Sequence, residues 1–577
     1  MTEIKLTAAE LIRAAIEQAY GQAPFARDEL AAMLEYPPDE NMGDLAFPCF
    51  KLSKTLRKSP VMIAEELSRV ISSRDFAKVE PVSGYLNFFV SREYYEEKII
   101  PEILQKGEDY GKSDVGKGKT VVLDYSSPNL CKPFHLGHLA STMIGHSIKK
   151  IHQFCGYNCV GINYIGDWGT QFGKQIAAYK LWGNEEEVKK GGVDELARLY
   201  VRINNEISGD EENGIAPRKD LADMARAEFH KLEEGDKENL RLWKWFVDIS
   251  LEECNRTYKK LGVDFDSYAG ESFYTDKMPA QVEKLREMGL LKIDQGASIV
   301  DLSEYNMPPC LILKTDGSTL YPTRDIAASV YRYNTYDFAK CIYVTASAQC
   351  LHFSQWFKVV ELMGYDFYDK LVHVPYGMVS IGGEKLATRT GNVILIRDLI
   401  DAAVEKVTAV INEKNPDLEN KEETAQAVGV GAVVFHYLLN SRIKDINFVM
   451  DDALSFDGNT GPYVQYTYAR TCSILEKAGE YKAEKIKITE KAEEDLAKIL
   501  SRFGEAVENA LNDYEPSDIT RYILDVCTAF NRFYHDCPII TAEDEAEKQT
   551  RTALTKATNT VLGSALPLIC MKTPRKI

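Results

Sequence analysis

Two histidines that stand three positions apart, His135 and His138, are well suited to chemistry on a phosphate. They follow a β-branched apolar run at 121–123, which predicts a buried strand, and they precede residues 140–154, which have helical periodicity. Such side chains share one face of a helix's first turn, where free amides and the helix dipole attract anions. Gly137 lets a ligand approach the backbone. We therefore predict that all three residues bind the triphosphate of ATP; a pair of surface histidines that cap a helix is the alternative.

A second candidate phosphate site is the glycine-rich loop 381–392, which carries Lys385 and Arg389 among hydroxyl side chains. Cations in such a loop can neutralise the charge that grows on departing pyrophosphate. A solvated hairpin is the other interpretation. A His-x-Gly-His pattern early in a sheet and a basic glycine loop after its last strand form a much rarer combination than either alone. Together they favour a nucleotide-binding enzyme.

The elements that must position these side chains divide the 577 residues into three parts. Residues 1–112 predict a small α+β domain, with helices over 8–19 and 60–72 and a strand over 85–90. A connector rich in glycine and lysine, 111–119, follows it.

The second part, 119–397, predicts a Rossmann-type domain with a parallel sheet. The strands at 121–123 and 159–165 alternate with helices, at a spacing typical of right-handed crossovers. A charged helical insertion at about 183–290 interrupts the sheet. The strand pattern then resumes at 298–302, 310–314, 341–345 and 371–375. The third part, 398–577, is helical almost throughout and predicts an all-α bundle.

Composition limits the partners and the compartment. A net charge of −18 argues against a uniformly basic surface for nucleic acid, although a local basic face is compatible with it. The first 20 residues contain no apolar stretch long enough for a signal or membrane segment. The twelve cysteines are scattered, and the closest two, Cys155 and Cys159, have no second pair nearby. We therefore expect no protein-held metal, and reduced thiols in the cytoplasm.

Six stretches resemble the arginyl-tRNA synthetases, a family of class I aminoacyl-tRNA synthetases. They are DYSSPNLCKPFHLGH (124–138), NYIGDWGTQFG (163–173), LYPTRDIA (320–327), QCLHF (349–353), KLATRTGN (385–392) and GPYVQYTYAR (461–470). The first and fifth resemble the HIGH and KMSKS signatures of the class. The resemblance extends from GDLAFPC at 43–49 almost to the end of the chain. It implies a Rossmann-type catalytic domain, an N-terminal domain that contacts the tRNA elbow, and a helical domain that contacts the stem and binds the anticodon.

The resemblance also assigns five residues to the substrate arginine. Asp325 matches the family residue that salt-bridges the guanidinium, and a carboxylate suits that planar fork. Tyr321, four positions earlier, matches a tyrosine that contacts the same group. Asp124, Asn129 and Gln349 match residues that hold the α-amino and carboxylate ends. Each of them alone could be structural, Asp124 above all, since it stands at a strand end.

One departure from the class pattern falls in the second signature. KMSKS has lysine at its fourth position, where this chain has Thr388. Many arginyl enzymes share this loss and carry a lysine just before HIGH, where Lys132 stands here; a solvated loop lysine is the alternative. The resemblance assigns catalysis to Lys132, His135, His138, Lys385 and Arg389, and ATP binding to His135, Gly137, His138, Met378 and Thr388.

The implied reaction is the ligation of arginine to tRNA(Arg). Arginine attacks the α-phosphorus of ATP, which is bound with Mg²⁺ over the carboxyl ends of the parallel strands, and forms arginyl-adenylate. A hydroxyl of the terminal adenosine, the 2′ in class I, then takes the arginyl group. Neither a covalent nucleophile nor an editing site is needed. We expect a monomer, with the insertion binding the acceptor end.

RNA contacts are expected mainly at unpaired bases. Asn87 matches the family's base-contacting asparagine in the segment that meets the tRNA elbow, and Tyr85 belongs to the same segment; the aromatic residues there can equally be core. The helix predicted to begin at Gly461 resembles the start of the anticodon-binding domain. No anticodon contact is assigned to its tyrosines, because aromatic residues at helical spacing are more often core.

Two other functions remain open. A small nucleotidyltransferase or another class I synthetase shares the HIGH-type site, but the long helical tail argues against the former. The polar set Tyr321, Asp325 and Gln349 argues against a synthetase for an apolar amino acid. A catalytically silent relative that binds tRNA or a protein is supported by Thr388 alone, since both histidines and Asp325 are present.

Overall fold

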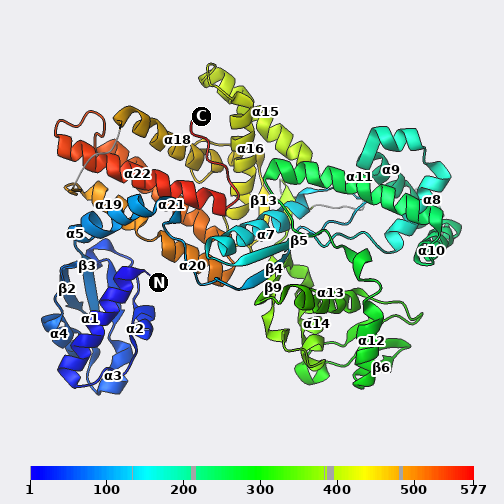
Figure 1. Ribbon diagram of the computed structural model, residues 1–577, viewed down its shortest axis with the longest axis horizontal. Coiled ribbons are helices and arrows are strands. Elements are labelled where there is room, and N and C mark those ends of the chain that lie inside the picture. Colours follow the sequence, from blue (N-terminus) through cyan, green and yellow to red (C-terminus); the bar gives the residue numbers. More distant parts are fainter. Residues whose placement is uncertain (1, 133, 210–215, 382–383, 386–394, 480–484) are drawn as a thin grey trace.

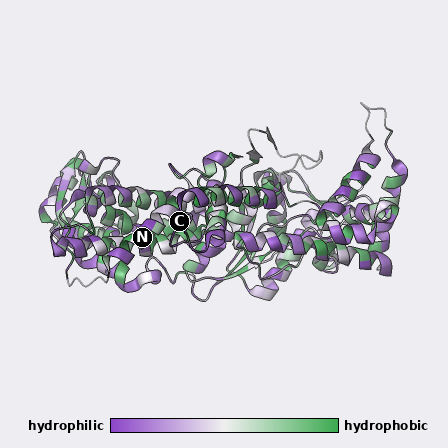
Figure 2. Cartoon of the chain, turned by 90° about the horizontal axis from the view of Figure 1, so that it is seen from above, coloured by the Kyte–Doolittle hydropathy of each residue, from purple (hydrophilic) through white to green (hydrophobic). Residues whose placement is uncertain are grey.

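The computed structural model describes residues 2–132, 134–209, 216–381, 384–385, 395–479 and 485–577. A small N-terminal domain and a helical bundle lie on one side of a central sheet, and a helical insertion extends on the other (Figure 1). Seen from above, the molecule is long and narrow, and its helices carry bands of hydrophilic and hydrophobic residues (Figure 2). This banding is the pattern of amphipathic helices that bury one face. No helix in the described ranges has the length and apolar character needed to cross a membrane.

The N-terminal domain packs helices against an antiparallel sheet with strand order β1-β3-β2. Its elements, including the helices that lead out of it, are α1 (Glu3–Tyr20), α2 (Arg27–Met33), β1 (Leu45–Pro48), α3 (Phe50–Leu56), α4 (Pro60–Val70), β2 (Phe76–Val82), β3 (Tyr85–Val90), α5 (Arg92–Tyr94) and α6 (Ile100–Lys106). The predicted strand and both predicted helices are present. Helix α4 begins at Pro60 because proline suits a first turn, and the Ser59 hydroxyl caps it by accepting the Met62 amide at 3.3 Å.

The central domain contains a parallel sheet with strand order β10-β9-β4-β5. Its elements are β4 (Thr120–Asp124), α7 (Leu136–Phe154), β5 (Asn158–Ile162), α13 (Tyr321–Tyr336), β9 (Lys340–Ala346), α14 (Cys350–Leu362) and β10 (Leu371–Tyr376). Val121, Val122 and Leu123 of β4 are fully buried, as expected for a strand covered on both faces. The predicted Rossmann-type parallel sheet is confirmed.

Two of the predicted strands lie outside this sheet. Strands β7 (Ala297–Val300) and β8 (Cys310–Leu313) pair antiparallel with each other, and β6 (Leu291–Asp294) pairs antiparallel with β7. The expectation that the strands at 298–302 and 310–314 continue the parallel sheet is therefore wrong. Residues 295 and 296 both have positive φ, so the chain turns straight back between β6 and β7 in a tight hairpin. A short apolar run does not reveal its partner strand.

The insertion and the bundle are helical, as expected. Their helices are α8 (Thr170–Trp182), α9 (Glu185–Ser208), α10 (Lys219–Glu233), α11 (Lys237–Leu261), α12 (Met278–Glu287), α15 (Ile396–Lys414), α16 (Lys421–Leu438), α17 (Met450–Ala453), α18 (Gly461–Ala478), α19 (Lys491–Leu500), α20 (Phe503–Asp513), α21 (Pro516–Asp536) and α22 (Glu545–Leu568). The part after residue 398 also contains a strand, β13 (Ile446–Phe448), which pairs parallel with β11 (Val379–Ile381). That part is therefore not purely helical.

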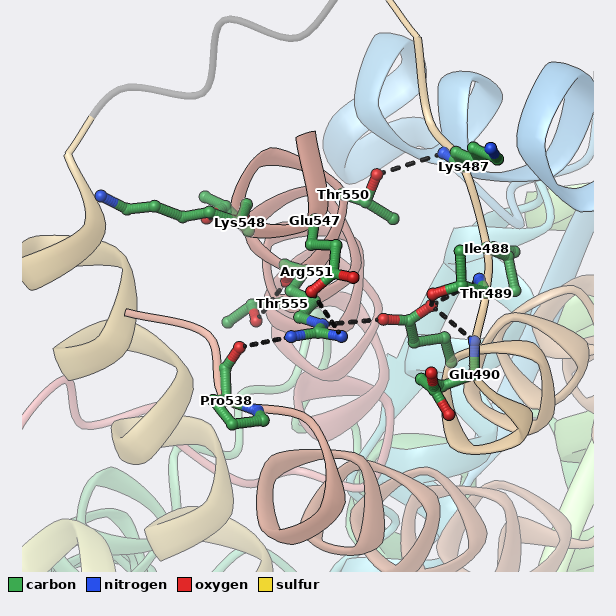
Figure 3. A network of polar contacts seen from close by, with 12 residues as sticks. Lys487, Ile488, Thr489, Glu490, Pro538, Glu547, Lys548, Thr550, Arg551 and Thr555 are labelled. Carbon is green, nitrogen blue, oxygen red and sulfur yellow. Dashed lines mark hydrogen bonds and ion pairs between the residues drawn. The ribbon is translucent and has the colours of Figure 1, made fainter. Parts of the chain in front are cut away.

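A buried ion pair joins two helices of the bundle (Figure 3). The Arg551 Nε of α22 donates to the Glu493 Oε1 of α19 at 2.8 Å, and Arg551 Nη1 donates to the Pro538 carbonyl at 2.9 Å. Glu493 Oε2 accepts the amides of Thr489 and Glu490, which caps α19. Because both charged side chains are buried, removing one would leave the other uncompensated. The pair therefore fixes α19 against α22.

Candidate active site

The predicted phosphate site lies at the carboxyl edge of the sheet, where α7 begins. The His135 Nδ1 accepts the Gly137 amide at 3.1 Å, and the His138 Nδ1 accepts the His135 amide at 3.3 Å. Because both Nδ1 atoms accept, each neutral ring carries its proton on Nε2. The ring centroids are 4.0 Å apart. Two side-chain N–H donors thus stand together at a helix N-terminus, and the same rings cap the helix.

Burial keeps both rings neutral. Burial and the neighbouring Lys132 lower the pKa of His135 to about 4. Burial, His135 and Lys132 lower the pKa of His138 to about 3. The histidines therefore offer neutral N–H donors to a phosphate, and positive charge must come from other groups, including the helix dipole.

Acid is expected to destabilise the folded chain through His138. An unfolded histidine titrates near pH 6.5, so between that value and the folded pKa of about 3 the unfolded state binds more protons. The contribution of the neutral His138 ring to the free energy of unfolding is complete above this window. It is lost as the pH falls through the window, by about 2 kcal/mol at pH 5. Urea unfolding of the natural chain and of His138→Asn at pH 7 and pH 5 measures this loss. Between pH 7 and pH 5, the variant should lose about 2 kcal/mol less stability than the natural chain. Equal losses in the two proteins would contradict a buried neutral ring.

The described ends of the second signature are tied to the first. Leu395, which follows the loop, forms a β-bridge with His135, and the Ile396 amide donates to the Phe134 carbonyl at 3.1 Å. Before the loop, Lys385 pairs with β11 through its backbone. Thr388 and Arg389 lie outside the described residues. The last described residue before the gap, Lys385, therefore lies beside β11, and the first one after it, Leu395, lies beside His135.

Lys132 and Met378 each have a described contact with another part of the chain. The Lys132 Nζ stands 5.5 Å from the centre of the Tyr200 ring on α9, so this lysine faces the insertion. Met378 is half-exposed just before β11, and its amide donates to Asp445 Oδ1 at 2.8 Å. Their roles toward ATP stay predictions.

The predicted arginine-binding residues come from α13, a short 3-10 helix, strand β4 and the loop that follows it. Tyr321 and Asp325 lie one turn apart at the start of α13; Tyr321 is two-thirds exposed and Asp325 is largely buried. Gln349 is exposed in a short 3-10 helix (Ser347–Gln349) just before α14. Asn129 is exposed in the loop after β4 and forms a β-bridge with Gly166. The fold thus gathers these side chains at the carboxyl edge of the sheet.

Asp124 has its own partners inside the protein. Its Oδ2 forms an ion pair with Arg332 Nη2 at 2.7 Å, and its Oδ1 accepts the Ser127 hydroxyl at 2.9 Å. Burial raises the pKa of Asp124, although Arg332 opposes that shift. Both carboxylate oxygens are therefore engaged in the architecture of the loop, which is the structural role that the sequence left open. A contact between Asp124 and substrate stays a prediction.

A further acid at this site, Glu271, is revealed only by the structure. Glu271 Oε1 pairs with Arg324 Nη1 at 2.9 Å, and both side chains are mostly buried. Burial raises the pKa of Glu271 to about 7, and nearby Asp167 and Asp325 add to this shift while Arg324 opposes it. The buried Tyr164 hydroxyl has no hydrogen-bond partner among the described residues. Arg324 stood within the LYPTRDIA stretch, but nothing in the sequence marks Glu271, which lies between α11 and α12 in the predicted insertion.

The comparisons with known proteins decide the family. The family model "tRNA synthetases class I (R), catalytic domain" matches residues 99–450, "Arginyl tRNA synthetase N terminal domain" matches 7–90, and "DALR anticodon binding domain" matches 464–577. An arginine–tRNA ligase of Alkaliphilus metalliredigens is 49% identical over 581 aligned positions, which cover 100% of both chains. Another, from Clostridium botulinum, is 50% identical over 544 positions, 94% of this chain and 95% of the relative. The chain belongs to the arginyl-tRNA synthetases.

Solved structures of this family share the enzyme's fold. Arginyl-tRNA synthetases from Thermus thermophilus and Plasmodium falciparum have TM-scores of 0.82 and 0.81 at 24% and 23% identity. The former alignment covers 99% of both chains and the latter 100%. The predicted family and class I fold are confirmed. The boundaries at 112 and 397 stay predictions.

The two residues predicted to contact tRNA differ in exposure. Asn87 is only 4% exposed at the centre of β3, so its side chain presents almost no surface to a base. Tyr85 is partly exposed, with its ring edge-on to Phe50 at 5.3 Å between centroids. Tyr85 is therefore better placed for an RNA contact, and both assignments stay predictions.

Proposed function

We propose that the enzyme activates arginine with ATP and transfers it to the 3′-terminal adenosine of tRNA(Arg), with release of AMP and pyrophosphate. The observation that carries the proposal is the meeting, at one sheet edge, of the paired N–H donors of His135 and His138 with the Asp325 carboxylate of α13. Asp325 accepts the planar guanidinium and Tyr321 covers it. The arginine carboxylate then reaches the α-phosphorus without a covalent intermediate on the protein.

The phosphate groups meet donors from both signatures. The Nε2–H groups of His135 and His138 bind oxygens of the triphosphate, and their contact strengthens as charge develops on pyrophosphate. Lys132, Lys385 and Arg389 supply the positive charge that the neutral histidines lack. Within the described ranges no three His, Cys, Asp or Glu side chains gather closely enough to hold an ion. Mg²⁺ would therefore arrive on the ATP phosphates, as this ion usually does.

Ligand binding should stabilise the enzyme selectively. With ATP present, arginine at about 100 times its Kd is expected to add about 2.7 kcal/mol of stability, because it binds only the folded state. Lysine at the same concentration should add far less, since an ammonium does not match a planar, multi-acceptor site. Thermal melts with ATP plus either amino acid measure this difference. Equal shifts with arginine and lysine would contradict the assignment of arginine.

An exposed aromatic platform on the bundle is suited to unpaired bases. The Arg470 guanidinium on α18 lies 4.9 Å from the Tyr466 ring centre and 5.3 Å from that of Tyr534 on α21. The Arg470 Nη1 also donates to Asn531 Oδ1 at 2.5 Å. Both tyrosines are nearly half exposed, although aromatic residues at helical spacing are usually buried. This platform, rather than the buried part of α18, is our candidate anticodon contact.

The variant Tyr466→Ala is expected to weaken tRNA(Arg) binding by about tenfold or more, because stacking is worth about 1–3 kcal/mol per base. Filter binding at fixed salt measures the Kd. Tyr514 lies outside the platform but is unsuitable as a control, because its hydroxyl accepts a hydrogen bond from Lys340 Nζ. Tyr305→Ala is the matched control, since Tyr305 is similarly exposed but lies beyond the insertion. If both variants weaken binding equally, the platform is not the anticodon contact.

The insertion is proposed to bind the acceptor end. Tyr200 lies beside Lys132, and one turn further along α9 the Asn204 Oδ1 accepts the Lys174 Nζ at 2.7 Å. These groups extend from the phosphate site along the insertion, and cations with an aromatic ring suit a single strand. All twelve cysteines are free thiols, which supports a reducing compartment such as the cytoplasm.

A further inference from the structure

His352 connects α14, which begins directly after Gln349, to α13, which carries Tyr321 and Asp325. It lies on the first turn of α14, three positions after Gln349, and its Nε2 donates to Asp325 Oδ2 on α13 at 2.7 Å. Three-quarters or more of each of the two side chains is buried. This histidine stands within the QCLHF stretch, and the sequence alone indicates no role for it.

We propose that His352 is a positioning residue for the recognition of arginine. By occupying Oδ2, it holds the Asp325 carboxylate in one orientation and leaves Oδ1 for the substrate guanidinium. The inference rests on the proposed function, because it requires that Asp325 binds arginine. It deepens that function by naming what keeps the carboxylate available.

A carboxylate at this position needs such a restraint because a guanidinium of the protein stands next to it. Arg324 precedes Asp325 in sequence, and the negative charge of Asp325 is among the groups that raise the pKa of Arg324. The terminal torsion of an aspartate is soft, so Asp325 could turn toward this internal competitor. Two contacts oppose that turn: Glu271 pairs with Arg324 at 2.9 Å, and His352 holds Asp325.

His352 is a suitable anchor because its own place is fixed by the sheet. The next residue, Phe353, stacks on His373 of β10 with ring centroids 4.2 Å apart and an interplanar angle of 7°. The His373 Nε2 is 2.8 Å from the Thr345 hydroxyl near the end of β9. The first turn of α14 is therefore attached to two strands of the sheet, β10 directly and β9 through His373. Through His352, this rigid edge sets the position of a side chain on α13.

The experiment compares two replacements of His352 that differ in one hydrogen bond. His352→Gln keeps an N–H donor at similar reach, whereas His352→Leu fills the space without a donor. We expect the leucine variant to raise the arginine KM by about 10- to 100-fold, the usual value of a hydrogen bond to a charged group. The KM for ATP should stay unchanged in both variants, and glutamine should restore most of the affinity for arginine. Steady-state aminoacylation with arginine, ATP and tRNA(Arg) gives these constants.

Two further variants make the outcomes distinct. Gln355→Ala lies on the same helix and loses bonds to the Pro308 and Pro309 carbonyls, so it controls for general damage to α14. Asp325→Asn tests the pocket itself. If Asp325→Asn raises the arginine KM but His352→Leu does not, the inference is overturned. It is also overturned if glutamine and leucine act alike, which would indicate a packing role. If Asp325→Asn leaves the arginine KM unchanged, the pocket assigned under the proposed function fails as well.

Discussion

Asparagine in place of Asp325 is expected to raise the arginine KM by about a hundredfold or more, because a desolvated guanidinium without its counter-charge costs about 3–5 kcal/mol. The side chain keeps its size and lies on a well-formed helix, so the fold and the KM for ATP should change little. Aminoacylation at varied arginine concentration measures the effect.

The matched control for this prediction is Asp337→Asn. Asp337 caps the other end of α13 in a left-handed conformation that asparagine tolerates. Asp337→Asn therefore removes one carboxylate charge from α13, as Asp325→Asn does, without changing the arginine site. An unchanged arginine KM in Asp325→Asn would remove Asp325 from the pocket.

Asparagine in place of His138 is expected to slow adenylate formation by about 10²- to 10³-fold, the usual cost of losing one preorganised donor to developing charge. In the natural chain the His135 amide donates to the His138 ring, and the asparagine side-chain oxygen can accept the same bond. The start of α7 should therefore keep its structure. The KM for arginine should change little, because the lost donor faces phosphate. Single-turnover formation of arginyl-adenylate separates this step from transfer to tRNA.

His230→Asn serves as the control for His138, because His230 is a largely exposed histidine on α10 of the insertion. It should leave the rate of adenylate formation unchanged. Intact turnover in His138→Asn would contradict the role of the paired N–H donors at the phosphate site.

Much of the fold follows from local sequence signals. The apolar run at 121–123 became the buried strand β4, and Gly461-Pro462 begins α18 as the placement of proline predicted. His135 and His138 meet at the start of α7 because residues three apart share a helical face. These features depend on neighbours in the chain, so the sequence alone contains the information.

The remaining features depend on partners that are distant in sequence. The strands at 297–300 and 310–313 joined a separate antiparallel sheet, since a short apolar run does not specify its partner. Asn87 proved to be buried because β3 is the middle strand of its sheet. The acid Glu271 is brought to Arg324 only by the fold.

The charge state of the phosphate site is a further property that the sequence did not provide. A pair of histidines beside a helix N-terminus suggested only a favourable place for an anion. Burial makes both rings neutral, and the capping bonds fix which nitrogen carries the proton. Under the proposed function, such a site would bind phosphate through directed N–H donors, and the positive charge would come from the lysines and the arginine of the two signatures.

The central claim is that this chain activates arginine, and ATP–pyrophosphate exchange tests it most directly. Exchange should be measured with arginine and with lysine, in the presence and in the absence of tRNA(Arg). We predict exchange that depends on arginine when tRNA(Arg) is present, with little or none for lysine. Exchange with arginine in the absence of tRNA would keep the enzyme class and indicate that the site is complete without bound RNA. A folded chain that shows no exchange with arginine under either condition would contradict the account and indicate a silent relative that only binds.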